Sequence, residues 1–562
     1  MGSVAPFLIF YLGAALAAVT SGRLRQVILL AIPVVGAVNL YYLPEGGSNT
    51  FELFDYTLVL TRVDKLSLVF GYVFHLAALL GLIYALHVRD TVQHVSAILY
   101  AGSSIGALFS GDLISLFVFW EMTAITSVFL ILARRTERAR KTAMRYLVIQ
   151  VLSGVILLAG ALIWVNETGS IAFDFIGLDA PGGWLIFLAF GIKAAFPLLH
   201  NWLTDAYPEA TPTGTVFLSA FTTKLAVYAL ARGYPGTEIL VYIGATMTMF
   251  PIFYAVIEND LRRVLSYSLI NQVGFMITGI GIGTELAING AVSHAFVHII
   301  YKALLFMSMG AVLFRTGKIN GSELGGLYKS MPLTTVFCIV GAASISAFPL
   351  FSGFVAKSMV LAAALDEGYS GVWLLLLFAS AGVFHHSGIK IPFFAFFAHD
   401  SGIRTKEAPP NMLAAMFVAA FASVFIGIYP WPLYDILPFP VDFVPYTQAH
   451  VLTQMQLLIF SALAFTFLKL TSLYPPELPG INIDAEWTYR RFGPGVIKKL
   501  AGIFGPLDQA IRGVFLNSLN LATAKVYRYL GPKGVMARTI QAGSMVYWAV
   551  TLLAVYLVLN LI

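Results

Sequence analysis

The amino-acid sequence predicts an all-α polytopic membrane protein with about 16 transmembrane helices. Of its 562 residues, 59% are hydrophobic and only 11% are charged, whereas soluble domains have about 25% charged residues. The mean hydropathy is +0.83. The apolar residues gather in runs long enough to cross a bilayer, which takes roughly 20 residues per helix. This composition excludes a soluble enzyme, a disordered chain and a nucleic-acid-binding protein.

Sixteen apolar segments are bounded by charges or by clusters of Gly and Pro. In lipid each segment must be a helix, because every backbone polar group needs a partner within the segment. The approximate centres of the expected spans are residues 11, 33, 76, 101, 122, 154, 192, 222, 247, 273, 301, 349, 384, 420, 462 and 550.

These spans fall into six expected parts. Residues 1–90 hold three N-terminal spans, 91–235 a first five-helix repeat, 236–400 a second repeat, 401–473 two further spans, 474–538 a basic interfacial segment and 539–562 the final span. The interfacial segment mixes basic and apolar residues and is interrupted by Gly505-Pro506 and Gly531-Pro532. We therefore expect it to form two or more short amphipathic helices on the cytoplasmic surface of the membrane.

The loop charges predict the orientation of the chain. Loops of odd number hold 25 Lys and Arg residues, among them the run Arg134–Lys141, whereas loops of even number hold only Arg62, Lys65 and Arg232. Cytoplasmic loops of membrane proteins are enriched in Lys and Arg. We expect the odd loops in the cytoplasm and both termini outside.

Charged residues inside the spans indicate function. Lys193, Lys224, Lys302, Lys357 and Lys390 lie within apolar segments. Glu121 and Asp112 accompany them, although Asp112 begins its helix and is explained equally well as an interfacial or helix-initiating residue. A charge at the bilayer centre costs about 2.5 kcal/mol or more. A chain does not accumulate such groups for stability, so we expect them to form an ion path.

Two lysine pairs suggest an internal duplication. Lys193 and Lys224 in spans 7 and 8 correspond to Lys357 and Lys390 in spans 12 and 13, at nearly equal intervals. Pro197 and Pro349 predict that helices 7 and 12 are broken. A five-helix unit has an odd number of spans, so its second copy enters the membrane from the opposite face. Inverted repeats with interrupted helices are typical of transporters.

Glu121 and Lys193 are the first expected site. Glu121 lies mid-helix among aromatic residues, where a carboxylate stays ionised only near a positive charge. A buried lysine can release its proton and become a neutral amine, which suits a relay. The alternatives are a purely structural Glu–Lys pair, or a lysine that satisfies the free carbonyls of a broken helix.

His294, His298 and Lys302 follow one another at intervals of four residues and so share one helix face. Histidine gains and loses a proton near neutral pH and can link two lysines. Histidines packed between helices are the structural alternative. A metal site is disfavoured because no carboxylate or cysteine accompanies the pair.

Lys390 lies near the end of its helix, so its side chain could instead extend to the membrane surface. His385 and His386 on the same helix are weaker candidates for an exit path. The glycines between Gly279 and Gly283 lie inside a span and do not form a dinucleotide loop. We expect no nucleotide, redox cofactor or metal.

Several motifs together resemble the antiporter-like subunits shared by respiratory complex I and the Mrp-type multisubunit sodium/proton antiporters. The resemblance covers roughly residues 60–430. The motifs are Phe119-Trp120-Glu121, Lys193 with His200-Asn201-Trp202-Leu203-Thr204-Asp205-Ala206, Ala210-Thr211-Pro212-Thr213, the segment Asp260–Ser268, the His294/His298/Lys302 face and Gly353-Phe354-Val355-Ala356-Lys357. Within this superfamily, the segments 388–397 and 404–412 are most similar to the D-type component of the Mrp antiporters.

This resemblance implies that Glu121 and Lys193 form the essential pair and that Lys224, His298 and Lys357 continue the relay. The M-type component of complex I usually has glutamate where this chain has Lys357, which argues against that identity. The sixteen expected spans exceed the fourteen usual in the family, and the tail is reminiscent of the L-type component of complex I.

We therefore expect a proton-translocating subunit of a sodium/proton antiporter in a bacterial inner membrane, a secondary transporter rather than an enzyme. Its expected partners are the other membrane subunits of an Mrp-type complex and membrane lipids. Its expected substrates are H+ and possibly Na+, with the sodium site elsewhere. The alternatives are a proton-pumping subunit of a complex I or membrane-bound hydrogenase machine, and a membrane subunit that energises inorganic-carbon uptake.

Overall fold

The computed structural model describes residues 4–480, 482–538 and 541–561. They form two compact units, one up to Asn482 and one from Ile483 onward. Among the described residues, 13 helices are long and apolar enough to cross a membrane, and Pro6–Val19, Gly183–Ala194 and Pro332–Ile345 are shorter apolar helices. Each expected span centre falls on one of these helices, except residue 349, which falls in a break. The predicted all-α polytopic fold is confirmed.

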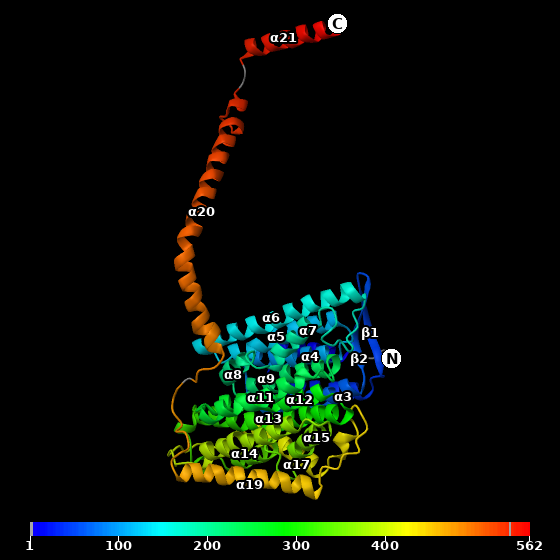
Figure 1. Ribbon diagram of the computed structural model, residues 1–562, viewed down its shortest axis with the longest axis vertical. Coiled ribbons are helices and arrows are strands. Elements are labelled where there is room, and N and C mark those ends of the chain that lie inside the picture. Colours follow the sequence, from blue (N-terminus) through cyan, green and yellow to red (C-terminus); the bar gives the residue numbers. More distant parts are fainter. Residues whose placement is uncertain (1–3, 481, 539–540, 562) are drawn as a thin grey trace. The chain divides into compact units, whose positions relative to one another are not determined.

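The helices of the first unit run largely side by side (Figure 1). Its first half contains α1 (Pro6–Val19), α2 (Gly22–Tyr41), α3 (Lys65–Ala85), α4 (Thr91–Phe109), α5 (Leu113–Leu132), α6 (Glu137–Thr168), α7 (Gly183–Ala194), α8 (Asn201–Ala206), α9 (Gly214–Ala220) and α10 (Thr222–Gly233). Its second half contains α11 (Ile239–Ile257), α12 (Leu261–Ile282), α13 (Glu285–Thr316), α14 (Pro332–Ile345), α15 (Ser352–Asp366), α16 (Ser370–Val383), α17 (Pro410–Ile428), α18 (Trp431–Tyr434) and α19 (Gln448–Leu470). Helices α12 and α13 are almost wholly buried, so their polar side chains face protein and not lipid.

A β-hairpin that the sequence analysis did not predict follows α2. Strands β1 (Gly46–Leu53) and β2 (Tyr56–Val63) pair antiparallel. Asp112 fastens the hairpin to α5, because its carboxylate accepts the Val59 N–H at 2.7 Å and also caps the helix by accepting the Ser115 N–H at 2.7 Å. The helix-initiating interpretation of Asp112 is therefore correct.

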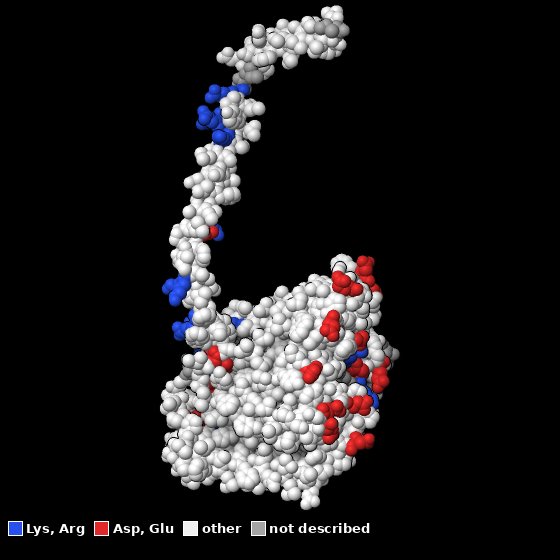
Figure 2. All heavy atoms as spheres, in the orientation of Figure 1, with Lys and Arg blue, Asp and Glu red and all other residues white. Residues whose placement is uncertain are grey.

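Acidic side chains gather at the end of the first unit where the hairpin lies (Figure 2). They include exposed residues of the even-numbered loops and of the hairpin, such as Glu52, Asp55, Asp174, Asp179 and Glu238. The even loops are thus acidic as well as poor in Lys and Arg. The scarcity of Lys and Arg, and not the acidic residues, is the feature on which the orientation prediction depends.

The two expected helix breaks share a sequence and a backbone conformation. Both consist of Ala-Phe-Pro-Leu, at residues 195–198 between α7 and α8 and at residues 347–350 between α14 and α15. Ala195 and Leu198 have φ values of 65° and 69°, and Ala347 and Leu350 have 55° and 72°. These left-handed conformations are unfavourable for residues other than glycine. The two breaks are therefore alike in sequence and in backbone conformation, as the predicted duplication requires.

Two further spans are irregular in ways the sequence analysis did not predict. Span 8 is divided at Phe221 into α9 and α10. Helix α16 continues as π-helical segments, Phe384–Lys390 and Phe393–Phe397. Such π-helical segments are frequent at functional sites.

The second unit contains α20 (Gly493–Leu530) and α21 (Ala542–Leu561). The prediction of two or more short helices was wrong, because α20 is one helix of 38 residues that passes through Pro506. Proline removes a single backbone donor, and the turns on either side remain hydrogen-bonded. The second Gly-Pro pair does end the helix, at Gly531.

Candidate functional site

All five lysines within the spans are buried inside the first unit. The exposed fraction is 1% for Lys357 and 0% for Lys193, Lys224, Lys302 and Lys390. None of them extends to the membrane surface, which overturns that alternative for Lys390. Each must therefore find polar partners within the protein or remain unpartnered at considerable cost.

Lys193 lies in the last turn of α7 and reaches α5. Its Nζ donates to the Trp120 carbonyl oxygen at 2.5 Å and to Thr123 Oγ1 at 2.9 Å, and it lies 4.3 Å from the centre of a Trp120 ring. Glu121 follows Trp120 in the chain, and its carboxylate interacts electrostatically with Lys193. The two residues nevertheless form no direct ion pair among the described residues, and Glu121 Oε1 is buried without a hydrogen-bond partner.

Gly154 of α6 makes room for the Glu121 carboxylate. A methyl group at Gly154 would overlap Glu121 Oε1. The Glu121 carboxylate therefore occupies space that any larger residue at position 154 would fill.

Three of the lysines bind the free carbonyls of helix ends. Lys224 Nζ donates to the Ser219 carbonyl at 2.7 Å, near the end of α9. Lys357 Nζ donates to the Ile345 carbonyl at 2.8 Å, at the end of α14. Lys390 Nζ lies among carbonyls at the end of α11. A cation is stabilised at a helix C-terminus by the helix dipole, so the structural alternative stated for Lys193 applies to these three.

The face of α13 that carries His294, His298 and Lys302 differs from these three lysine sites, because its basic groups are largely unpartnered. His294 Nε2 lies 3.2 Å from Gln272 Oε1 and 3.0 Å from Tyr301 Oη. Both ring nitrogens of His298, and Lys302 Nζ, are buried with no hydrogen-bond partner among the described residues. Lys224, Lys302 and Lys357 all lie close enough to His298 to interact with it electrostatically. The expected His/Lys face thus lies at the centre of a cluster of basic side chains, which we call the cation cluster: Lys224, His294, His298, Lys302 and Lys357.

A set of hydroxyl groups that the sequence analysis missed lies between Lys193 and Lys224. Ser127, one turn from Thr123 on α5, lies 2.8 Å from the Tyr146 hydroxyl. Tyr100 Oη lies 2.5 Å from Thr222 Oγ1, and Lys224 Nζ donates to the adjacent Thr223. These side chains come from α4, α5, α6 and α10. Only the i, i+4 spacing of Thr123 and Ser127 hinted at them in the sequence.

Part of the sequence matches a known protein family. Residues 110–385 match the sequence profile described as "NADH:quinone oxidoreductase/Mrp antiporter, TM". This segment belongs to that family. It contains Glu121 and all of the buried lysines and histidines described above except Lys390.

Individual relatives include antiporter and hydrogenase proteins. The chain is 32% identical to the D subunit of the Na(+)/H(+) antiporter of Alkalihalophilus pseudofirmus over 306 residues, and 26% identical to hydrogenase-4 component B of Escherichia coli over 427 residues. The matches cover 50% and 67% of this chain. They span only 62% and 63% of those relatives.

Two solved structures share the fold at 21% identity. The Mrp complex from Dietzia sp. DQ12-45-1b matches 82% of this chain and 97% of its own chain with a TM-score of 0.69. An archaeal membrane-bound sulfane sulfur reductase matches 98% of this chain and 99% of its own with a TM-score of 0.71.

A cavity of about 250 Å³ in the first unit reaches Lys357. It lies between α15, α16 and α19, and its polar lining includes Ser358, His450 and Gln454. Leu365, near the end of α15, also lines it. The cavity therefore extends from Lys357 toward the end of the bundle where α15 ends and α19 begins.

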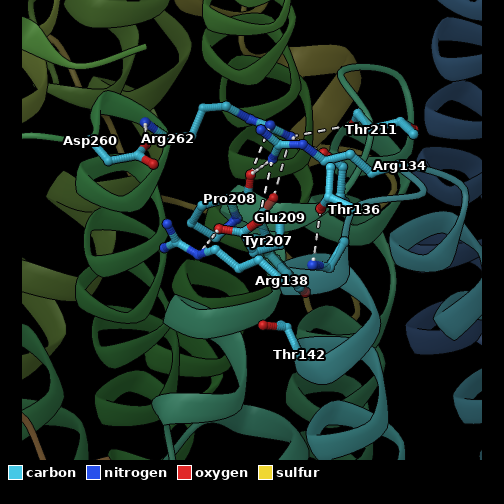
Figure 3. Close-up of polar contacts among 12 residues, drawn as sticks. Arg134, Thr136, Arg138, Thr142, Tyr207, Pro208, Glu209, Thr211, Asp260 and Arg262 are labelled. Atoms are coloured by element: carbon cyan, nitrogen blue, oxygen red, sulfur yellow. Dashed lines mark hydrogen bonds and ion pairs between the residues drawn. The ribbon is translucent and has the colours of Figure 1, made fainter. Parts of the chain in front are cut away.

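Arginines fix the loop between α8 and α9 (Figure 3). Arg138 pairs with Glu209 at 2.7 Å, and the Arg134 guanidinium donates to the Pro208 carbonyl at 2.6 Å. Arg262 binds the carbonyls of Pro208 at 3.0 Å and Ala210 at 3.1 Å, and also contacts Thr215. Arg262 is one of the 25 Lys and Arg residues that were assigned to the odd loops, but it is a buried residue of α12 and is 1% exposed.

Arg145 forms an ion pair with α8, the short helix that follows the first break. It lies 2.7 Å from the carboxylate of Asp205 on α8. This ion pair therefore joins α6 to α8. The sequence offered no signal for the pair, because 60 positions separate its members.

Proposed function

We propose that this chain is the proton-translocating subunit of a multisubunit cation/proton antiporter, with Na+ as the coupled cation. The observation that supports this most strongly is the pair of unpartnered basic side chains, His298 and Lys302, in the centre of the cation cluster. Folded proteins pair nearly all of their buried polar groups. Leaving two proton acceptors unpaired costs stability and suits a site where protons arrive and leave.

The proposed route begins at Glu121 and Lys193. A proton that neutralises Glu121 weakens its hold on Lys193, which then gives its own proton to the hydroxyl set and becomes a neutral amine. Each hydroxyl accepts a proton on oxygen and donates its own hydrogen onward. Lys224 receives the proton, and His298 and Lys302 carry it to Lys357. Every step moves one proton, so charge is conserved.

The proposed orientation places the odd loops in the cytoplasm of a bacterial cell and both termini outside its inner membrane. The cavity at Lys357 then opens toward the outer face. It would give Lys357 access to that side of the membrane.

We further propose that the coupled cation crosses elsewhere. Sodium prefers oxygen ligands, and the buried axis is mostly cationic. Partner membrane subunits of an Mrp-type complex would supply the cation site, alone or at an interface with this chain.

The test uses the complex purified with its native partners and reconstituted in vesicles. Proton flux is followed with a pH-sensitive dye after a Na+ gradient is imposed. Lys193→Ala and Glu121→Ala should each abolish the flux, whereas Lys406→Ala, at an exposed loop position, should not. Normal flux in both axis variants, with the complex assembled, would overturn the proposal.

A second candidate is a proton-pumping subunit of a redox complex. It is favoured by the near-complete overlap with the sulfane sulfur reductase chain, 98% against 82% for the Mrp chain. The native complex distinguishes the two. Flavin and iron–sulfur subunits would copurify with a redox pump, and only membrane subunits with an antiporter.

A further inference from the structure

A second carboxylate–lysine pair lies at Lys390, and the sequence analysis missed its acidic member. Glu477 Oε1 is 3.0 Å from Lys390 Nζ, and their side chains are 6% and 0% exposed. Glu477 belongs to the segment that follows α19, which the sequence analysis assigned to the interfacial tail. The structure places it in the first unit.

Lys390 does not need Glu477 to satisfy its hydrogen bonds. Its Nζ lies 3.2 Å from the carbonyl oxygen of Ala255, 2.6 Å from that of Val256 and 2.6 Å from that of Glu258. An ammonium group has three donors. Three carbonyls therefore saturate it, and Glu477 is a fourth acceptor whose contribution is its charge and its capacity to take a proton.

Aromatic packing holds the Glu477 segment against the π-helical part of span 13. The Tyr474 ring stacks on His385 with ring centres 5.6 Å apart and lies 6.1 Å from the ring of Phe394. The Tyr474 N–H donates to the Leu468 carbonyl at 2.9 Å, which turns the chain back toward the bundle. The position of Glu477 is therefore fixed by the fold.

His386 connects Lys390 to the cation cluster. This histidine is fully buried and interacts electrostatically with both Lys302 and Lys390. Its Nδ1 lies 2.8 Å from Ser387 Oγ, which donates to Ser268 of α12 at 2.8 Å. A basic group thus stands between the end of the α13 face and the Lys390–Glu477 pair.

We infer that Glu477 is the terminal proton carrier at this end of the relay. The Lys390 ammonium gives a proton to the Glu477 carboxylate, which leaves a neutral amine and a neutral acid. Glu477 then releases the proton to water, and Lys390 is reprotonated from the side of His386. This inference rests on the proposed function and adds a branch to it, because Lys357 has its own cavity.

The electrostatic surroundings of Glu477 suit this exchange. Burial raises the pKa of its carboxyl above the usual 4.5, and Glu258 raises it further, whereas Lys390 and Lys469 lower it. Tyr474, on the same segment, is a further titratable neighbour, and His385 stacks on its ring. The net rise in pKa brings the carboxyl nearer to the pH at which a relay works.

The first test compares Glu477→Gln, Glu477→Asp and Asn482→Ala in the reconstituted complex. Gln keeps the shape but cannot ionise, so proton flux should fall at least about tenfold. Asp should retain part of the flux. Asn482→Ala removes only a contact with Glu258 from the same segment and should leave the flux unchanged. Normal flux in Glu477→Gln overturns the inference.

The second test separates a relay from a structural tie. Transport through Glu477 requires its carboxylate form, so flux should decline as the pH falls through its pKa. Lys469→Met removes a charge that lowers this pKa and should shift the decline to higher pH. Lys406→Met, at an exposed position elsewhere, should not shift it. An unshifted profile in Lys469→Met means that Glu477 is a structural partner only, and this holds even if Glu477→Gln fails to assemble.

Lys193→Ala, measured in parallel, distinguishes the two levels of failure. If Lys193→Ala abolishes flux and Glu477→Gln does not, the proposed function stands and the role of Glu477 is refuted. If Lys193→Ala transports normally, the relay itself is refuted.

Discussion

The ammonium group of Lys357 donates a 2.8 Å hydrogen bond to the carbonyl oxygen of Ile345, across the break between α14 and α15. In the first repeat, Lys193 lies before the equivalent break, two positions ahead of Ala195. The two lysines that the sequence pairs are thus on opposite sides of their breaks. Lys193 lies in the last turn of the half-helix before its break, α7. Lys357 lies in the half-helix after its break, α15, and donates back to the end of α14.

We expect Lys357→Met to abolish transport without unfolding the protein. The variant leaves the Ile345 carbonyl unpaired, at a cost of about 1–3 kcal/mol, but it also removes an ammonium group whose burial opposes folding. Thermal unfolding in detergent should therefore change little, while proton flux falls by about a hundredfold or more. Lys318→Met, at an exposed loop position, is the control. Normal flux in Lys357→Met would remove this residue from the relay.

Gly154→Ala should impair transport although it changes no charge. The added methyl group meets the Glu121 carboxylate and must displace it. Gly371→Ala is the matched control, because it is also a helical glycine and a methyl group there meets nothing within 4 Å. Proton flux should fall only in the first variant. Equal flux in both would mean that the position of Glu121 does not matter.

The cavity at Lys357 should admit water-soluble reagents from the outer side. The chain has one cysteine, Cys338, which is buried and can be replaced by serine. Ala362 lines the cavity, so Ala362→Cys in that background should react with a membrane-impermeant thiol reagent added outside. Leu374→Cys, on α16 and 62% exposed on the apolar surface, should react poorly in lipid. Labelling of Ala362→Cys only from the cytoplasmic side would reverse the proposed orientation of the cavity.

Arg262 should be important for stability rather than for transport chemistry. Its guanidinium satisfies several carbonyls of the loop after α8, and each hydrogen bond to a charged group contributes about 1.5–3 kcal/mol. Arg262→Ala should lower the free energy of unfolding by about 3 kcal/mol or more. Arg262→Lys should rescue little, because an ammonium cannot reproduce the planar fork. An unchanged unfolding temperature in Arg262→Ala would refute this role.

Asp64, which caps α3, should make stability fall in acid. Burial raises the pKa of its carboxyl, but Arg232, the Ser67 N–H and Arg62 together lower it below 3.8 in the folded protein. Its contribution to stability is therefore complete above the unfolded pKa and is lost as the pH falls through the folded value. Asp64→Asn should be less stable than the wild type at pH 6, and the difference should shrink toward pH 2. A difference that is constant with pH would exclude the ionised pair.

The spans and the buried lysines could be predicted from sequence because both depend on local patterns. Lipid requires about 20 apolar residues per helix, and a lysine within such a run stands out at once. The prolines at 197 and 349 likewise marked the two breaks. Long-range pairs had no such signal. Glu477 lies in a polar loop far along the chain from Lys390, and only folding brings them together.

The β1–β2 hairpin and the continuous α20 were missed for other reasons. A search for apolar runs disregards the short alternating segment at 46–63, although its Thr and Val residues favour strands. In α20, the proline was given too much weight. One proline in a helix of 38 residues removes little of its total hydrogen bonding.

The π-helical segment Phe384–Lys390 has a consequence for sequence length. One additional residue in a turn rotates every later side chain by about 100° relative to an uninterrupted helix. Deleting a single residue between Phe384 and Ser387 would restore regular winding and swing the Lys390 amine away from its three carbonyls. Span 13 therefore depends on its number of residues as strictly as on their identity.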